Sequence, residues 1–250
     1  MPPRFETIGI EGLPEIRPGD PIAELILAAA ARQGTPVIAD DVLVIGQKIV
    51  SKAEGRLLRL ADVTPSPIAA AMAAELGRDP RLVEVILRES RRVVRMDKGI
   101  LIVETRHGWI CANAGVDQSN VEREVVALLP EDADRSARAL RDRIRALAGV
   151  DVSVIIADTF GRPWREGLTN VAIGVAGVAP LKSYLGAQDP AGHTLQATIL
   201  AVADELAGAA ELVMGKLDRI PAAIVRGLAL PAAEEGSKPL LRDPARDLFR

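Results

Sequence analysis

The stretch VIIADTFGRPWREG, residues 154–167, passes abruptly from apolar residues to side chains that can bind ions. A carboxylate and a hydroxyl come first, at Asp158 and Thr159, and two guanidinium groups follow at Arg162 and Arg165. Carboxylate oxygens are the ligands that hard divalent cations prefer, and guanidinium groups bind carboxylates in a bidentate manner. A helix cap is the competing interpretation, but a glycine and a proline follow and no apolar helical stripe develops. The pattern therefore favours a functional segment over a helix cap, and its two arginines could receive an acidic substrate.

Three more polar segments follow predicted strands or hairpins, which hold side chains rigidly while loops let them face a ligand. They are EGLPE at residues 11–15, QK at 47–48 with SKAEG at 51–55, and NAGVDQSN at 113–120. Each segment also has a purely structural interpretation. Gly12 and Pro14 are typical of turns, a lone Lys52 is typical of a solvated surface, and Asp117 and Asn120 commonly form Asx turns.

The composition disfavours several classes of protein. With 250 residues, 48% of them hydrophobic, the chain can bury the core of one domain or of two closely packed lobes. A net charge of −3, an isoelectric point of about 5.6 and only 2% aromatic residues disfavour nucleic-acid binding. Cys111 is the one cysteine, and with His107 and His193 alone beside it a Cys/His zinc site is disfavoured. We therefore interpret these three residues as structural and expect any metal to be oxygen-ligated.

Common nucleotide-binding motifs and membrane signals are absent from the sequence. It contains neither G-x-x-x-x-G-K-[ST] nor G-x-G-x-x-G. The longest apolar run, residues 25–31, is seven residues long, which is well short of a membrane span. The first residues, MPPRFETIGIEG, contain no hydrophobic region of a signal peptide. The expected location is therefore cytoplasmic, with no membrane partner.

Local patterns predict an α+β protein with mixed sheets and packed helices. Strands are expected at residues 5–10, 42–45, 100–103, 109–112, 150–157, 171–175 and 224–225, with residues 49–50 extending or restarting the second. Helices are expected at residues 22–32, 67–77, 80–91, 136–148 and 196–214. Residues 234–250 are charged and interrupted by prolines, so a surface tail is expected there. Because strands and helices do not alternate regularly, a doubly wound sheet is disfavoured.

Five segments, taken together in their order and spacing, resemble the coenzyme F420-0:L-glutamate ligase family. They are GIEGLPEI, IVSKAEGR, CANAGVDQSNV, DTFGRPWREG and VADELAGAAELVMGK. The resemblance covers about residues 7–228, and five separate segments in register are far more specific than any one of them. It implies a single ligase domain over residues 1–250, in the stand-alone form without the flavin-binding domain that is fused to the ligase in some actinobacterial relatives.

The resemblance implies a GTP-dependent, GDP-forming enzyme that adds L-glutamate to F420-0 in the biosynthesis of coenzyme F420, and it leaves open how many γ-linked glutamates are added. It implies Mg²⁺ or Mn²⁺ as the metal, K⁺ as an assisting ion, and an intertwined homodimer of two-lobed subunits. The chemistry suits these parts, because a carboxylate must be activated before an amine can attack it. Transfer of the γ-phosphoryl group of GTP to F420-0 would give an acyl phosphate, which the amine of glutamate then attacks.

The resemblance also assigns individual residues. The implied GTP contacts are Gly12, Leu13, Pro14, Glu15, Gln47, Lys52, Asn120, Met214, Gly215, Lys216, Leu217, Asp218, Arg219 and Ile220. Asp117 and Asp158 match ligands of one divalent metal, and Thr159 matches a ligand of a second. Lys52, Asp117 and Asp158 are therefore the implied catalytic residues, because phosphoryl transfer depends on positioning and on neutralising charge.

The sequence departs from the family at two of these positions. Gln47 stands where relatives carry serine, and Lys216 stands where archaeal relatives carry a glutamate that binds the second metal. Since an ammonium has no lone pair for a metal, Lys216 is expected to contact a phosphate as a point charge. Two other functions stay open: a nucleotide-dependent ligase that accepts a different acid, and a GTP- or metal-sensing protein without turnover.

Overall fold

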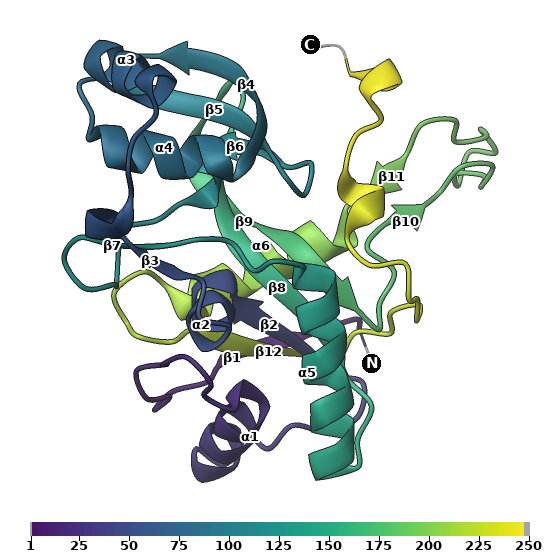
Figure 1. Ribbon diagram of the computed structural model, residues 1–250. Coiled ribbons are helices and arrows are strands. Elements are labelled where there is room, and N and C mark those ends of the chain that lie inside the picture. Colours follow the sequence, from purple (N-terminus) through teal and green to yellow (C-terminus); the bar gives the residue numbers. More distant parts are fainter. Residues whose placement is uncertain (1, 248–250) are drawn as a thin grey trace.

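A five-stranded mixed sheet forms the centre of the protein (Figure 1). The computed structural model describes residues 2–247 of the chain. The strands follow the order β1 (Glu6–Gly9), β12 (Ala222–Arg226), β2 (Val42–Gly46), β8 (Ser153–Arg162) and β9 (Arg165–Ala176). β2 and β8 run parallel, and the other neighbours are antiparallel. Parallel strands need a crossover connection, and here the connection from β2 to β8 contains every element between residues 47 and 152.

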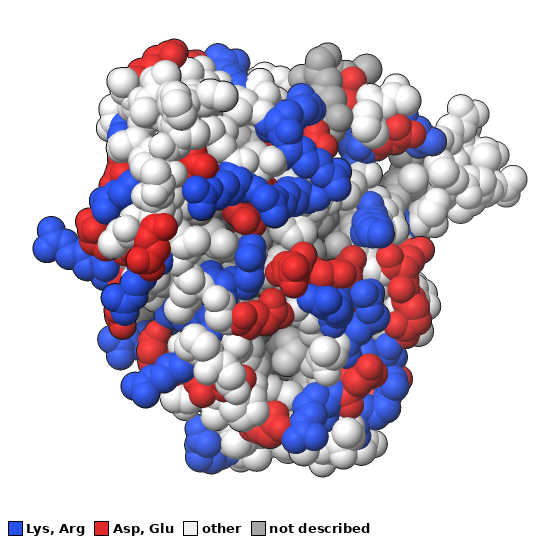
Figure 2. All heavy atoms as spheres, viewed as in Figure 1, with Lys and Arg blue, Asp and Glu red and all other residues white. Residues whose placement is uncertain are grey.

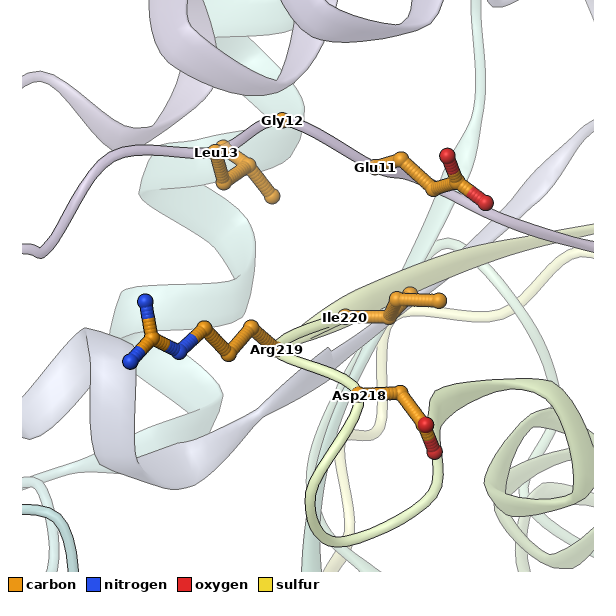
Figure 3. A pocket seen from close by; sticks show the side chains of 6 residues that line it. All are labelled: Glu11, Gly12, Leu13, Asp218, Arg219 and Ile220. Atoms are coloured by element: carbon orange, nitrogen blue, oxygen red, sulfur yellow. The ribbon is translucent and has the colours of Figure 1, made fainter.

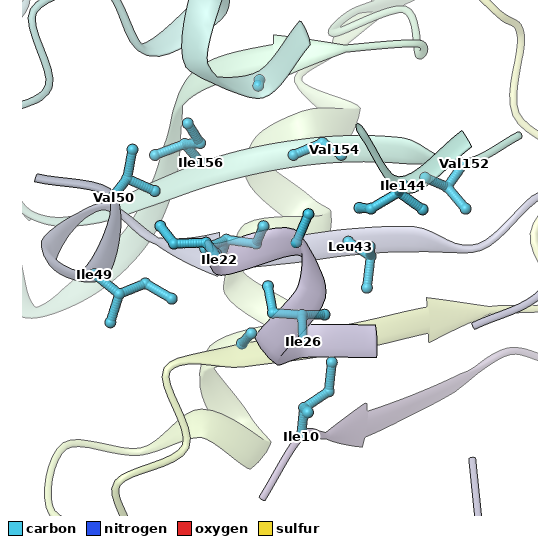
Figure 4. Close-up of a cluster of buried hydrophobic side chains, with 14 of the residues drawn as sticks. Ile10, Ile22, Ile26, Leu43, Ile49, Val50, Ile144, Val152, Val154 and Ile156 are labelled. Atoms are coloured by element: carbon cyan, nitrogen blue, oxygen red, sulfur yellow. The ribbon is translucent and has the colours of Figure 1, made fainter. Parts of the chain in front are cut away.

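Side chains of the central strands alternate between two apolar cores, one on each face of the sheet. Leu43 belongs to the first core and its neighbour Val44 to the second. Figure 4 shows the first core, where Ile26 and Ile144 from two helices pack with the strands. The helices of this face are α1 (Ile22–Arg32), α2 (Gln47–Ala53) and α5 (Ala133–Ala148), whereas α6 (Val202–Met214) covers the other face.

A smaller region beside the central sheet has a core of its own. Its three-stranded sheet consists of β4 (Ser90–Asp97), β5 (Ile100–Thr105) and β6 (Ile110–Ala112), with α3 (Pro67–Leu76) and α4 (Pro80–Arg88) beside it. The short pair β3 (Leu57–Arg59) and β7 (Val125–Ala127) lies between the two regions. A second short pair, β10 (Lys182–Ser183) and β11 (Ile199–Leu200), projects from the body as an arm (Figure 1). The α+β class with mixed sheets is thereby confirmed.

Capping residues explain where several helices begin. Ser66 accepts a hydrogen bond from the backbone N–H of Ala69 at 3.2 Å, and Asp79 accepts one from Arg81 at 2.8 Å, with proline at the first helical position in both cases. The second of these helices ends at residue 88, earlier than predicted, because β4 begins at residue 90. α5 begins three residues earlier than predicted, since Asp132 caps it by accepting from the N–H of Arg135.

The prediction for residues 49–50 was wrong. They lie in α2, which begins directly after β2, and they do not extend the strand. Both side chains are buried in the first core against the central sheet. A pair of β-branched residues suits a strand or a buried helix, and only packing against the sheet distinguishes the two.

Two other predicted elements also have different bounds in the structure. The strand predicted at 150–157 begins at Ser153 and continues to Arg162, because β9 pairs with it along its whole length. The helix predicted at 196–214 begins at Val202, after β11.

The predicted tail is partly packed. Ser237 is buried, its N–H donates to Asp134, and its hydroxyl donates to the carbonyl of Ile173; residues 248–250 lie outside the described part. Among the described residues, no helix combines the length and apolar character needed to cross a membrane.

Candidate functional site

The β8–β9 hairpin positions Asp158 and Thr159 at the centre of the candidate site. Asp158 is paired in register with Val171, and Thr159 with Asn170. A bulge leaves Ile173 as the extra residue of β9 just before this point, and bulges commonly redirect side chains next to active sites. The backbone pairing with β9 therefore holds both residues rigidly. The strand predicted to end at residue 157 continues through them.

Asp117 comes from the other side, on a segment that is also fixed by backbone pairing. Its N–H and carbonyl bond to Ala127 of β7 at 3.0 and 2.8 Å. Its carboxylate accepts hydrogen bonds from the N–H and the hydroxyl of Ser119, and it forms an ion pair of 2.7 Å with Lys48 of α2. The Asx-turn interpretation of this residue is thus correct in geometry, and the same carboxylate also carries a charge contact.

The two carboxyl groups have opposite electrostatic environments. Burial raises the pKa of Asp158 to about 6; the N–H of Thr159 and two lysines lower it, and the charge of Asp117 raises it further. Burial acts in the same upward direction on Asp117, but the contacts with Lys48 and Ser119 outweigh it and lower the pKa of that carboxyl. Because the charge of Asp117 raises the pKa of Asp158, the two carboxyl groups share one electrostatic environment, as the ligands of a single cation would.

The donor set fits one hard metal ion and argues against a second. Two carboxylates suit Mg²⁺ or Mn²⁺, which keep several waters for substrate phosphates, and the described residues contain no cluster of three or more acidic, histidine or cysteine ligands. At Thr159, the hydroxyl donates to Asn170 at 2.7 Å and accepts a hydrogen bond from the ammonium of Lys216. Lys216 also lies 3.3 Å from a carboxylate oxygen of Glu211. A positive charge therefore already stands beside Thr159.

Lys52 is buried, so its interpretation as a solvated surface charge is wrong. Only 7% of the residue is exposed, and its ammonium is paired with the exposed carboxylate of Glu15. A buried ammonium is stable only with such a partner. Next to it, the hydroxyl of Ser51 donates to Gln47 at 2.8 Å, and both residues are buried. α2 thus presents a buried lysine whose ion-pair partner, Glu15, is largely exposed to solvent.

A cavity of about 550 Å³ brings together the first and last of the predicted GTP segments. Residues 11–13 lie opposite the turn formed by Asp218, Arg219 and Ile220 (Figure 3). Gly12 has φ +74°, a conformation that favours glycine, and its carbonyl accepts a hydrogen bond from Arg32. The tertiary fold therefore joins two segments that are more than 200 residues apart in the sequence.

Other residues of the predicted GTP segments occupy different environments. Met214 is buried against the second core at the end of α6, whereas Gly215 and Leu217 are exposed. Leu13 packs partly against the first core, and Pro14 is exposed. Their predicted contacts with GTP stay predictions.

The structure places three predicted residues away from this centre. Asn120 is exposed, with φ +55°, and does not line the cavity. Arg162 lies at the tip of the β8–β9 hairpin, where its guanidinium donates to the carbonyl of Glu166 at 2.6 Å. Arg165 follows on the far side of the same turn and is exposed. Their predicted roles stay predictions.

Three polar residues of the site were not predicted from the sequence. Lys48 precedes Lys52 by one helical turn, a spacing that would have been informative had residues 47–53 been predicted as a helix. Asn170 and Glu211 are joined by a hydrogen bond of 2.7 Å between β9 and α6. No local sequence pattern connects these two, because the contact depends on how α6 packs on the sheet.

Comparison with known proteins identifies the family of the chain. The sequence profile of the F420-0:Gamma-glutamyl ligase family matches residues 11–227. The chain is 50% identical to the coenzyme F420:L-glutamate ligase of Methanopyrus kandleri, with 98% of both chains covered. It is 46% identical to the protein of that name from Methanothermobacter thermautotrophicus, over 98% of this chain and 99% of the relative, and 39% identical to that from Methanocaldococcus jannaschii, over 99% and 97%. The chain belongs to the F420-0:gamma-glutamyl ligase family.

Proposed function

We propose that this protein joins L-glutamate to coenzyme F420-0, with GTP as the source of activation. Family membership supports the substrate class, and one structural observation carries the chemistry: Asp158, a carboxyl with a raised pKa, beside the carboxylate of Asp117. Such a pair is unfavourable without a cation and becomes favourable when one is shared. Perturbed carboxyl groups of this kind cluster at functional sites.

The site's own residues divide the work of phosphoryl transfer. A divalent cation held by Asp117 and Asp158 would neutralise the charge that develops on the transferred phosphoryl group. Lys52 would exchange its ion pair with Glu15 for contacts to phosphate oxygens, and the cavity between residues 11–13 and 218–220 would hold another part of the nucleotide. The γ-phosphoryl group would pass to the terminal carboxylate of F420-0, GDP would leave, and the amine of glutamate would then displace phosphate from the acyl phosphate.

The finer points of assembly and ion use belong to the same proposal. A homodimer is supported by the projecting β10–β11 arm, which exposes Leu185, Ile199 and Leu200 (50%, 45% and 37% of each residue). Shared burial of this arm between two subunits would remove these side chains from water. K⁺ would assist the reaction, and one or more γ-linked glutamates would be added.

The test is a complete reaction with each component removed in turn. Purified protein is incubated with F420-0, GTP, L-glutamate and Mn²⁺, and the products are followed by mass spectrometry together with GDP and phosphate. We expect a product heavier by one or more glutamyl residues, and one GDP per residue added. Turnover with another acid but not with F420-0 would identify a different ligase, and GTP binding without phosphate release under any combination would identify a sensor.

A further inference from the structure

A second cavity of about 240 Å³ shares no lining residue with the cavity between residues 11–13 and 218–220. It lies between the β5–β6 turn, the start of α5 and the 3₁₀ helix of Lys238–Leu240. The smaller region contributes Arg91, Arg106, His107 and Trp109 to its lining, and the C-terminal segment contributes Lys238. Figure 2 shows basic side chains gathered on this face beneath the three-stranded sheet, opposite acidic side chains near the start of α5.

The cavity is lined by three cations, Arg91, Arg106 and Lys238, and by three carboxylates, Glu131, Asp132 and Asp134. Within the described part of the chain, Arg106 and Lys238 form no ion pair, and Arg91 approaches Glu104 only at 3.9 Å. The carboxylates have contacts of their own, and Glu131 pairs with Arg135 at 3.2 Å. Asp134 accepts two backbone N–H bonds of 2.8 Å, and Asp132 accepts one of 2.9 Å as the cap of α5. A ligand with carboxylate groups could therefore pair with Arg106 and Lys238 without displacing a protein carboxylate from them.

One buried polar atom in the cavity is without a partner among the described residues. His107 Nε2 lies 3.0 Å from the carbonyl of Glu131 and therefore donates to it, which leaves Nδ1 as an acceptor in the neutral ring. Nδ1 is buried and has no hydrogen-bond partner. Buried polar atoms are rarely left unsatisfied, so this nitrogen indicates a donor on the ligand, such as an ammonium group.

The cavity lies near Asp158, on the same face of the central sheet. Ile173 lines it, and Val171, two residues earlier on β9, is the register partner of Asp158. Two residues along a strand span about 7 Å and return to the same face. A second segment gives a similar relation: Trp109 lines the cavity and lies just before β6, two residues from Cys111, whose thiol pKa is raised to about 12 by burial and by the charge of Asp158. Ile173 on β9 and Trp109 before β6 thus both place the cavity near Asp158.

We propose that this cavity binds the amino-acid substrate, an amino dicarboxylate such as L-glutamate. Arg91, Arg106 and Lys238 pair with its two carboxylates, and His107 Nδ1 accepts a hydrogen bond from its amino group. Cations and an acceptor in one cavity distinguish this chemistry from that of F420-0 or GTP, which are anionic but lack an ammonium. The assignment rests on the proposed function. It supplies a binding site for glutamate, which neither the nucleotide cavity nor the carboxylate pair provides.

The first experiment is steady-state kinetics of Arg106→Ala and Lys238→Ala, with Arg92→Ala as the matched control. Arg92 lies on β4, is paired with Glu104 at 2.8 Å and does not line the cavity. Loss of one charge-assisted hydrogen bond should raise KM for glutamate by about 10- to 100-fold, while KM for GTP and kcat at saturating glutamate stay within about twofold. The control should change none of these values. Unchanged KM for glutamate in both variants, or an equal change in Arg92→Ala, would overturn the proposal.

The second experiment measures binding directly and does not require turnover. Calorimetric titration compares L-glutamate with glutarate, which lacks the amine, in the wild type and in His107→Phe. The wild type should prefer glutamate by about tenfold, and the variant should lose this preference because the acceptor nitrogen is gone. Equal affinity for the two ligands in the wild type contradicts the assignment. Failure of the ligase reaction with normal glutamate binding would contradict the proposed function and leave this site intact.

Discussion

Replacing Asp158 with asparagine is expected to stabilise the protein at neutral and alkaline pH while abolishing most of its activity. Asparagine has nearly the same size and keeps an oxygen that can accept the N–H of Thr159, but it carries no charge. The wild-type carboxyl is buried beside Asp117, and its pKa is raised from 3.8 to about 6. Ionising this group in the folded protein therefore costs free energy that the unfolded chain does not spend.

The magnitude follows from the raised pKa. Each pKa unit corresponds to about 1.4 kcal/mol, so a rise from 3.8 to about 6 corresponds to about 3 kcal/mol. Below pH 3.8 the carboxyl is protonated in both states and contributes nothing. Between pH 3.8 and 6 the unfolded state ionises first and the folded state loses stability, and above pH 6 the full cost is present. For a chain of 250 residues, this is a gain of about 6–12 °C in Tm for Asp158→Asn at pH 8.

The assay is urea unfolding of the wild type and Asp158→Asn, with a metal chelator present, at pH values from 4 to 8.5. The stability difference should be largest at pH 8 and shrink toward zero near pH 4. Activity with added Mn²⁺ should fall by about a hundredfold or more, the scale of losing a main electrostatic contact in the transition state. A variant less stable than the wild type at pH 8, or a difference independent of pH, would refute the reasoning.

Asp117→Asn is the matched comparison because its expected sign is opposite. The contacts with Lys48 and Ser119 lower the pKa of Asp117 despite its burial, so its charge stabilises the folded protein. That contribution is present above the ordinary pKa of 3.8 and is lost as the pH falls through the lowered value. The asparagine variant should therefore be less stable than the wild type at pH 8, and the two proteins should converge in acid.

Three further changes test other parts of the structure. Lys52→Met should weaken GTP binding about tenfold or more and leave the Tm of the ligand-free protein within a few degrees, because an apolar side chain of similar length replaces a buried ammonium whose partner, Glu15, is exposed and stays solvated; unchanged GTP affinity in a calorimetric titration would remove Lys52 from the nucleotide site. Lys216→Glu should increase the Mn²⁺ concentration needed for half-maximal turnover, since the positive charge beside Thr159 must then be supplied by an ion, and superimposable Mn²⁺ titrations would contradict this. Asp134→Ala leaves the N–H groups of Val175 and Ser237 without an acceptor and should lower the free energy of unfolding by about 2 kcal/mol or more, a loss that urea unfolding would fail to show if water replaced the carboxylate.

Local patterns predicted those elements whose stability depends on neighbouring residues. The helix at residues 22–32 has its predicted bounds, and the caps at Ser66 and Asp79 mark real helix starts. Apolar periodicity and capping are written in consecutive residues, so they can be recognised without the fold. The strand at 153–162 is different, because its polar second half is extended only through pairing with β9.

The sequence by itself determined the family and the chemical types at the site: two carboxylates, a lysine, and the segments that resemble GTP contacts. These are properties of side chains and of order along the chain, and they are the same in the folded and unfolded protein. Only the tertiary structure decided that Lys52 is buried, that Asp158 has a raised pKa, and that Lys216 lies against Thr159. Burial and the distance between charges depend on which distant segments pack together, and charge interactions strengthen as water is removed from around them.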